Sequence, residues 1–131
     1  MSIEIRHRKT ADVILLRVPG DTLENVDLSG AFLRGASLPA VIATGACFQG
    51  ANLRDADLGH AQLRGVNFQG ALLMDARLFS ADLTDADLRN ADLTNADLSE
   101  ANLANADLSG ARLDGTNLQN ARGTWRWTQA S

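Results

Sequence analysis

The sequence predicts an all-β solenoid, in which the chain winds into stacked coils, on the strength of two observations. A leucine or its replacement recurs at every fifth residue from Leu23 to Leu118, and at 18 of these 20 sites a small apolar residue, Ala or Val, stands two places before it. Side chains two residues apart on an extended chain face the same way. A chain that runs extended for a few residues and then turns a corner would therefore bury both residues of each pentapeptide.

The five-residue spacing argues against the two commoner ways of building a core. Of the 20 positions in the leucine series, 17 are Leu, two are Phe and one is Ala43, while 15 of the 20 small positions are Ala. On an α-helix five residues turn through about 500°, so successive leucines would spread around the axis. On one continuous strand an odd spacing would send them alternately to opposite faces.

The remaining positions of the pentapeptide fit a corner. The residue before the leucine, the outward position, is most often Asp or Asn, as in Asp82 and Asn102. The two residues after the leucine are the first and second corner positions, and the second is mostly Gly, Asn or Asp, which form turns readily. Because one pentapeptide cannot enclose its own leucine, the coils must stack at the strand spacing of about 4.8 Å.

The tandem pentapeptides ADLTD, ADLRN, ADLTN, ADLSE and ANLAN resemble the pentapeptide-repeat proteins, and the resemblance covers residues 21–122. It implies the fold of that family, a right-handed quadrilateral parallel β-helix with four pentapeptides in each 20-residue coil. The array would then form about five coils. Phe48 and Phe68 lie 20 residues apart and would stack in successive coils.

The stretch LPAVIATGA, residues 38–46, fits the pattern least well. Its central residue is Ala43, Pro39 follows Leu38, and Ile42 takes the outward position. Because the register is kept on both sides, we expect the coil to continue here with an underfilled face or a local bulge.

Residues 1–20 and 123–131 flank the array and are expected to cover its ends, where strand edges and leucine side chains would otherwise be bare. The start, IEIRHRKTADVILLRV, predicts two short strands around a polar KTAD turn, a hairpin-like cap. At the other end Trp125 and Trp127 would face one way from an extended segment. They form either a short C-terminal cap or a contact to a partner or a second copy.

The acidic charge is concentrated in the repeats. The net charge is −4, but residues 21–120 hold 14 acidic side chains and six arginines, about −8. Such a body repels phosphate, so direct nucleic acid binding is not expected. A single cysteine, Cys47, no apolar run near the length of a membrane span and no secretory signal favour a soluble, cytoplasmic protein with no membrane association.

No catalytic, cofactor-binding or metal site is predicted. The outward Asp and Asn residues would form an evenly repeated, solvated coat, whereas a general acid needs a carboxyl group shielded from water. His7 and His60 have no Cys or His at ligand spacing, and no glycine-rich phosphate loop is present. We therefore expect neither an enzyme nor a cofactor.

Apolar residues interrupt the polar coat at four places, and we interpret them as a candidate protein-interaction patch: Phe32, Leu72, Met74 and Phe79. Stacking by 20 residues places Phe32 and Leu72 in one outward column, and Met74 in the adjacent corner column with Arg34 and Arg54. Scattered exposure without function is the alternative, since single apolar residues are normal on surfaces.

Two functions are compatible with this sequence. The first is a non-enzymatic structural or protein-interaction module with a protein partner of unknown identity, acting as a monomer or as a homodimer joined through a terminal segment. The second comes from the resemblance, because some pentapeptide-repeat proteins imitate duplex DNA, bind type II topoisomerases such as gyrase and protect against quinolones. The short uninterrupted array and its basic ends favour the first.

Overall fold

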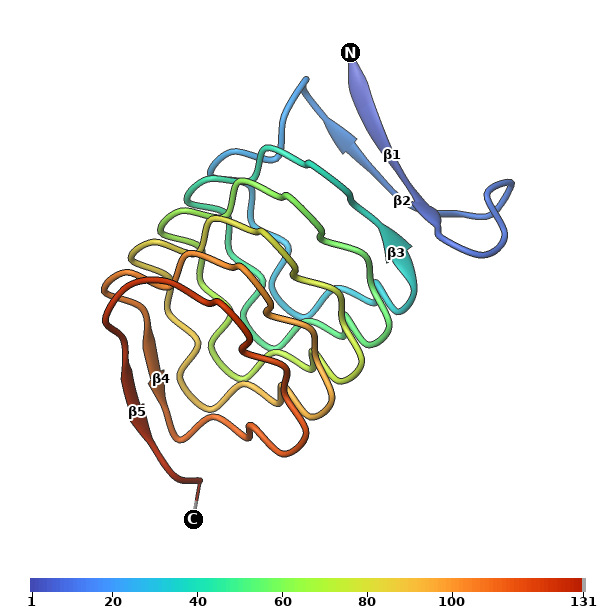
Figure 1. The fold of residues 1–131 in the computed structure, drawn as a ribbon. Helices are drawn as coiled ribbons and strands as arrows, with labels where there is room; N and C mark the ends of the chain where they lie inside the picture. The colour runs from blue at the N-terminus through green and yellow to red at the C-terminus, as the bar shows by residue number, and fades with distance from the viewer. Residues whose placement is uncertain (131) are drawn as a thin grey trace.

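The computed structural model describes residues 1–130 and contains five β-strands and no helix in that range (Figure 1). The strands are β1 (Ser2–His7), β2 (Ile14–Pro19), β3 (Ala36–Ser37), β4 (Asp107–Ser109) and β5 (Arg126–Thr128). The prediction of an all-β chain is confirmed for this range. Accordingly, residues 1–130 hold no helix that could span a membrane.

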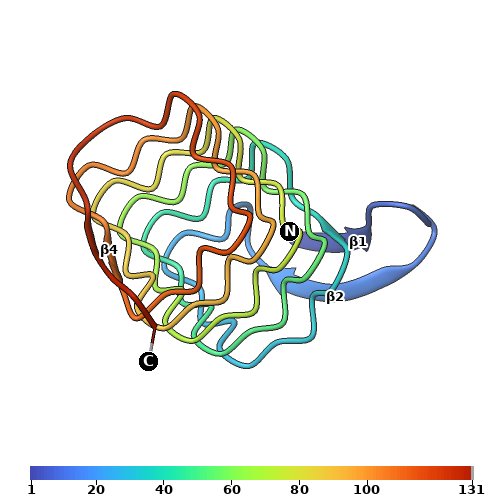
Figure 2. The same cartoon turned by 60° about the horizontal axis from the view of Figure 1, so that its bottom comes forward.

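The coils stack with a period of 20 residues. Within residues 1–130 the sixteen isolated bridges are all parallel, and each joins residues 20 apart, from Asp27–Cys47 to Asn102–Arg122. Hydrogen bonds flank each bridge; for example, Leu53 N donates to Leu72 O at 2.8 Å. A 20-residue coil holds four pentapeptides, so each coil has four sides, and the nested coils are seen from near the end of the cylinder in Figure 2.

The corners explain why Gly, Asn and Asp gather at the second corner position. All 20 residues in this position have a φ between 55° and 74°. Across the corner the next small residue donates to the leucine carbonyl, as Ala56 N does to Leu53 O at 3.1 Å. A positive φ at the third residue of a turn is the type II pattern, which Gly and Asn adopt most readily.

The small and central positions form one continuous core. From Ala46 to Ala111 every residue at these two positions is buried, and so is Ala43. Phe48 and Phe68 have no exposed surface, and their rings stack with centres 5.3 Å apart and planes at 29°. The stacking predicted from their 20-residue separation is therefore confirmed.

The irregular stretch 38–46 keeps the ladder intact. Ala40 N donates to Gly59 O at 2.8 Å, and Ala43 N donates to Gln62 O at 2.9 Å. Ile42 bridges Gln62 with the usual 20-residue register. The coil therefore continues through this stretch, as expected. Because the 20-residue register is kept, it contains no local bulge.

The N-terminal hairpin is joined to the first coil along one of the four sides of that coil. β1 pairs antiparallel with β2 and also with β3, which gives the strand order β2-β1-β3. Ile5 and Val18 belong to the core, with 0% and 5% of their surface exposed. Beyond the strands, Arg8 N donates to Gly35 O at 2.7 Å, so the hairpin and the coils share both backbone hydrogen bonds and apolar packing.

At the C-terminal end β5 adds a parallel strand beside β4 with a changed register. Leu108 pairs with Trp127, which is 19 residues further on instead of 20. Asn105 N still donates to Thr124 O at the spacing found elsewhere, so the register shortens after Thr124. Ser131, the last residue of the expected 123–131 tail, lies outside the described residues.

Candidate protein-interaction surface

Phe32 and Leu72 lie in one outward column, with one level of the solenoid between them. Bridges join Phe32 to Asn52 and Asn52 to Leu72, so the two apolar residues are about 10 Å apart at the usual strand spacing. Their side chains leave the core because the central leucines that follow them point inward. Phe32 is 85% exposed, and Leu72 is half-buried.

Met74 occupies the corner that follows this column, in line with two arginines. Asp55 N donates to Met74 O at 3.0 Å, and Gly35 N donates to Arg54 O at 2.8 Å. These bonds place Arg34, Arg54 and Met74 at one corner on successive coils, as the spacing predicted. Met74 is half-buried, whereas Arg34 is exposed.

Phe79 lies on the next side of the coil and packs against its own neighbours. Its ring covers Gly59, one coil earlier, so closely that a Cβ atom on Gly59 would lie 2.4 Å from the ring carbon Cζ. The ring meets His60 edge-on, with centres 5.1 Å apart, and the guanidinium carbon of Arg77 lies 5.4 Å from its centre. Phe79 therefore fills a recess over Gly59.

The loop between β1 and β2 reaches the same corner as Arg34 and Arg54, which the sequence did not predict. The Nη1 atom of Arg8 lies 3.1 Å from Oδ1 of Asp55, and Nζ of Lys9 lies 3.3 Å from Oδ2. Arg8 and Asp55 are 47 positions apart, and Arg8 lies outside the repeat, so the five-residue period could not have revealed this contact.

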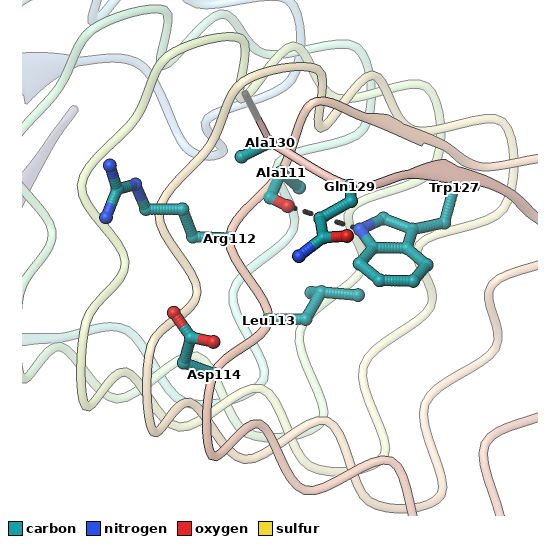
Figure 3. A pocket seen from close by; sticks show the side chains of 7 residues that line it. All are labelled: Ala111, Arg112, Leu113, Asp114, Trp127, Gln129 and Ala130. Carbon is teal, nitrogen blue, oxygen red and sulfur yellow. Dashed lines mark hydrogen bonds between the residues drawn. The ribbon is translucent and has the colours of Figure 1, made fainter.

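The two C-terminal tryptophans differ in burial. Trp125 is half-buried against the core, while Trp127 is 45% exposed and donates from Nε1 to the carbonyl of Ala111 at 3.2 Å. Beside Trp127 lies a hollow of about 380 Å³, where Figure 3 shows its indole near Leu113 and Gln129. Whether these tryptophans serve as a cap or as a contact stays a prediction.

The outward Asp and Asn side chains are more than a solvated coat, because each accepts a hydrogen bond from its own corner. In each case Oδ1 accepts from the backbone N–H two residues on, as Asp57 does from Gly59 at 3.0 Å. The bond occurs at Asp27, Asn52, Asp57, Asn67, Asp82, Asp87, Asp92, Asp97, Asn102, Asp107 and Asn117.

These bonds favour ionised carboxylates. Hydrogen bonds from Ser29 lower the pKa of Asp27, hydrogen bonds from Ser109 lower the pKa of Asp107, and the Arg89 side chain lowers the pKa of Asp87. A general acid at neutral pH requires the opposite shift. Within residues 1–130 no three His, Cys, Asp or Glu side chains come together as a metal site would require.

Comparison with known proteins identifies the repeat. A family model described as pentapeptide repeats matches residues 22–55, 51–95 and 81–120, with eight copies. The structure resembles HetL, a pentapeptide repeat protein involved in heterocyst differentiation regulation from the cyanobacterium Nostoc sp. strain PCC 7120. The identity is 35%, the TM-score is 0.74, and the match covers 75% of this chain and 41% of HetL. This chain thus spans about two fifths of the length of HetL.

Two further comparisons concern shorter or more distant proteins. The pentapeptide repeat protein alr5209 from Nostoc PCC 7120 is 31% identical, with a TM-score of 0.55 over 73% of this chain and 86% of its own. Full-length QnrB1, a plasmid-mediated fluoroquinolone resistance protein, is 16% identical over 84% of this chain and 70% of its own, with a TM-score of 0.36. No curated protein sequence matches the chain.

Proposed function

The chain belongs to the pentapeptide-repeat family, and on that premise we propose that it is a non-enzymatic protein-interaction module whose rod presents Phe32, Leu72 and Met74 to a protein partner. Phe79, the fourth residue of the predicted patch, packs in its recess over Gly59 and does not belong to the proposed surface. The exposure of Phe32, at 85%, carries the proposal. At eleven of the 20 outward positions an Asp or Asn accepts a hydrogen bond from the backbone N–H two residues on. Phe32 has no acceptor for this bond and exposes its ring instead. Exposed aromatic residues are frequent anchors of protein interfaces.

The rod is proposed to have about five coils, covered at one end by the β1–β2 hairpin and at the other by the tail that begins at residue 123. Burial of Ile5 and Val18 in the core supports the first cover, and the packing of Trp125 supports the second. A covered rod leaves its long sides as the surfaces for contact.

The test is affinity capture from the native host with the wild-type chain and with Phe32→Asp and Leu72→Asp. Asp is the commonest residue at the outward position, so both variants are compatible with the coil. Gln62→Asp, in an exposed outward position on another side, is the matched control. A partner retained by the control and lost by both variants is expected; a partner that all four proteins retain equally would contradict the use of this surface.

The alternative is a DNA mimic that binds a type II topoisomerase. The acidic repeats support it, but basic residues break the carboxylate columns, because Arg77 lies between Asp57 and Asp97. A gyrase supercoiling assay with added protein separates the two functions. Inhibition by the wild-type chain would favour the mimic, and unchanged supercoiling with excess protein would exclude it.

Self-association through a terminal segment is the second open point. Trp127 is 45% exposed beside the hollow at the C-terminal end, so a second copy could cover it. Light scattering on the full chain and on a chain lacking residues 123–131 measures the mass of each. A dimeric full chain and a monomeric truncated chain would place the contact in residues 123–131. The same oligomeric state for both chains would exclude a contact there.

A further inference from the structure

Basic side chains gather at one corner of a body that is otherwise acidic. Arg34 and Arg54 stand at that corner on successive coils, and the hairpin loop adds Arg8 and Lys9 beside them. Within this group the one carboxylate, Asp55, lies within 3.1 Å of Arg8 and 3.3 Å of Lys9. The residues 21–120 as a whole carry about −8, so the local sign is reversed.

The arginines of this corner are only partly engaged. The Nε atom of Arg54 is shielded from solvent and, within residues 1–130, has no hydrogen-bond partner. Arg34 is exposed. A guanidinium group offers five N–H donors in a planar fork that suits carboxylates, so the exposed Arg34 and the half-buried Arg54 suit an acidic ligand through donors other than this shielded Nε.

The basic corner adjoins the exposed ring of Phe32. Phe32 and Arg34 flank the buried Leu33 on the same coil. In the outward column of Phe32, Asn52 and then Leu72 follow on the next two coils. Farther along these columns Asp75 and Asp92 follow before the next arginine, Arg112, so acidic residues separate the basic corner at the hairpin from Arg112.

We infer that the face formed by Phe32, Arg34, Arg54 and the loop residues Arg8 and Lys9 docks an acidic protein segment that carries an apolar anchor. The inference rests on the proposed function and specifies the partner's chemistry. The anchor covers Phe32 and Leu72, while carboxylates of the segment pair with Arg34 and Arg54. Charge complementarity selects this occupant, because the remaining acidic coat repels the same segment and so restricts it to one face.

The experiment selects short random peptides against the wild-type chain and measures the affinity of selected peptides by fluorescence anisotropy. Enrichment of Asp and Glu around a Leu or Phe is expected, with affinity that falls as salt rises. Arg34→Glu should weaken binding roughly tenfold or more, since like charges at an interface cost at least about 1.4 kcal/mol. Arg64→Glu, the same charge reversal at the same corner position on another side, should change it less than about twofold.

The outcomes separate the inference from the proposed function. Peptides that lose affinity with Phe32→Asp but show no acidic enrichment and bind Arg34→Glu normally would overturn the inference and leave the proposed function standing. Failure to select any peptide sensitive to Phe32→Asp would count against both. A single-stranded oligonucleotide that binds at this face as tightly as the peptides, or a dimer of the free chain that Arg34→Glu dissociates, would assign a different occupant and overturn the inference.

Discussion

The carboxylate of Asp97 accepts two hydrogen bonds from Ser99, one from its backbone N at 2.9 Å and one from its Oγ at 2.6 Å. Asp92 and Thr94 make the same pair of bonds. The outward carboxylate thus holds the first residue of the corner in place. The outward carboxylates, which the sequence predicts to be a polar coat, therefore also stabilise the corners.

Removing this acceptor should weaken the corner. We predict that Asp97→Ala lowers the free energy of unfolding by about 1 kcal/mol, because the Ser99 N–H loses its partner. Asp97→Asn should cost less than half of that, since Asn102 accepts the equivalent bond from Ala104 N at 3.1 Å. Urea denaturation measures both, with the exposed first-corner residue in Asp114→Ala as control. Equal losses for the Asn and Ala variants would attribute the effect to charge.

Acid should destabilise the fold through the carboxylates that bond serine. The pKa values of Asp27 and Asp107 lie below the ordinary value of 3.8 because Ser29 and Ser109 donate to the ionised forms. A lowered folded-state pKa stabilises the fold above the unfolded-state value, and this contribution is lost as pH falls through the folded-state value. Denaturation midpoints should therefore be level above about pH 5 and decline below about pH 4.

The pair Asp27→Asn and Asp107→Asn tests the assignment, because the amide keeps an acceptor oxygen and does not titrate in this range. The double variant should show a shallower decline of the midpoint on acidification than the wild-type chain. An identical decline would mean that other carboxylates carry the acid sensitivity.

The repeat was predictable from sequence because every pentapeptide makes the same local contacts. The corner bonds of Asp97 could also have been found, since Asp-Leu-Ser and Asp-Leu-Thr place an acceptor two residues before a donor. The packing of Phe79 over Gly59 could also have been predicted, because the two residues lie 20 apart at the same corner position. Each follows from the period alone once four pentapeptides make a coil.

Contacts outside the period could not be predicted in this way. The hairpin loop carries Arg8 to Asp55 over 47 residues, and nothing repeated in the sequence determines where a flanking hairpin docks. The one-residue register change that sets Trp127 opposite Leu108 depends on a single step after Thr124. Such features depend on packing at the ends, where the repeat no longer constrains the chain.

Ala40 should tolerate glycine better than other alanines do. Its φ is 55°, a conformation that costs a residue with a Cβ atom roughly 1 kcal/mol or more. We predict that Ala40→Gly raises the free energy of unfolding by about 0.5 kcal/mol, since the relief exceeds the entropy lost. Ala104→Gly, at a first corner position without a positive φ, should lower it by about 0.5 to 1 kcal/mol. A loss of equal size at Ala40 would show that its turn carries no strain.

The stacked phenylalanines should carry much of the stability of the middle coils. Phe68 has no exposed surface, and its ring centre lies 5.3 Å from that of Phe48. Phe68→Ala should cost about 3–5 kcal/mol through lost burial and a cavity, and Phe68→Leu should cost less because Leu is the usual central residue. Phe32→Ala, at a ring that is 85% exposed, should stay within about 0.5 kcal/mol. A large loss at Phe32 would contradict its availability for a partner.

The recess under Phe79 can be tested by changing both of its walls. Gly59 is the one glycine of the eleven without a positive φ, so an added methyl group is opposed by the Phe79 ring and not by the backbone. Gly59→Ala alone should cost about 1–3 kcal/mol, as overpacking does. In the background of Phe79→Ala the same change should cost little, giving a coupling energy of about 1 kcal/mol or more in a double-mutant cycle followed by urea denaturation. Additive losses would mean that the ring is free of Gly59, and Phe79 would then be as available to a partner as Phe32.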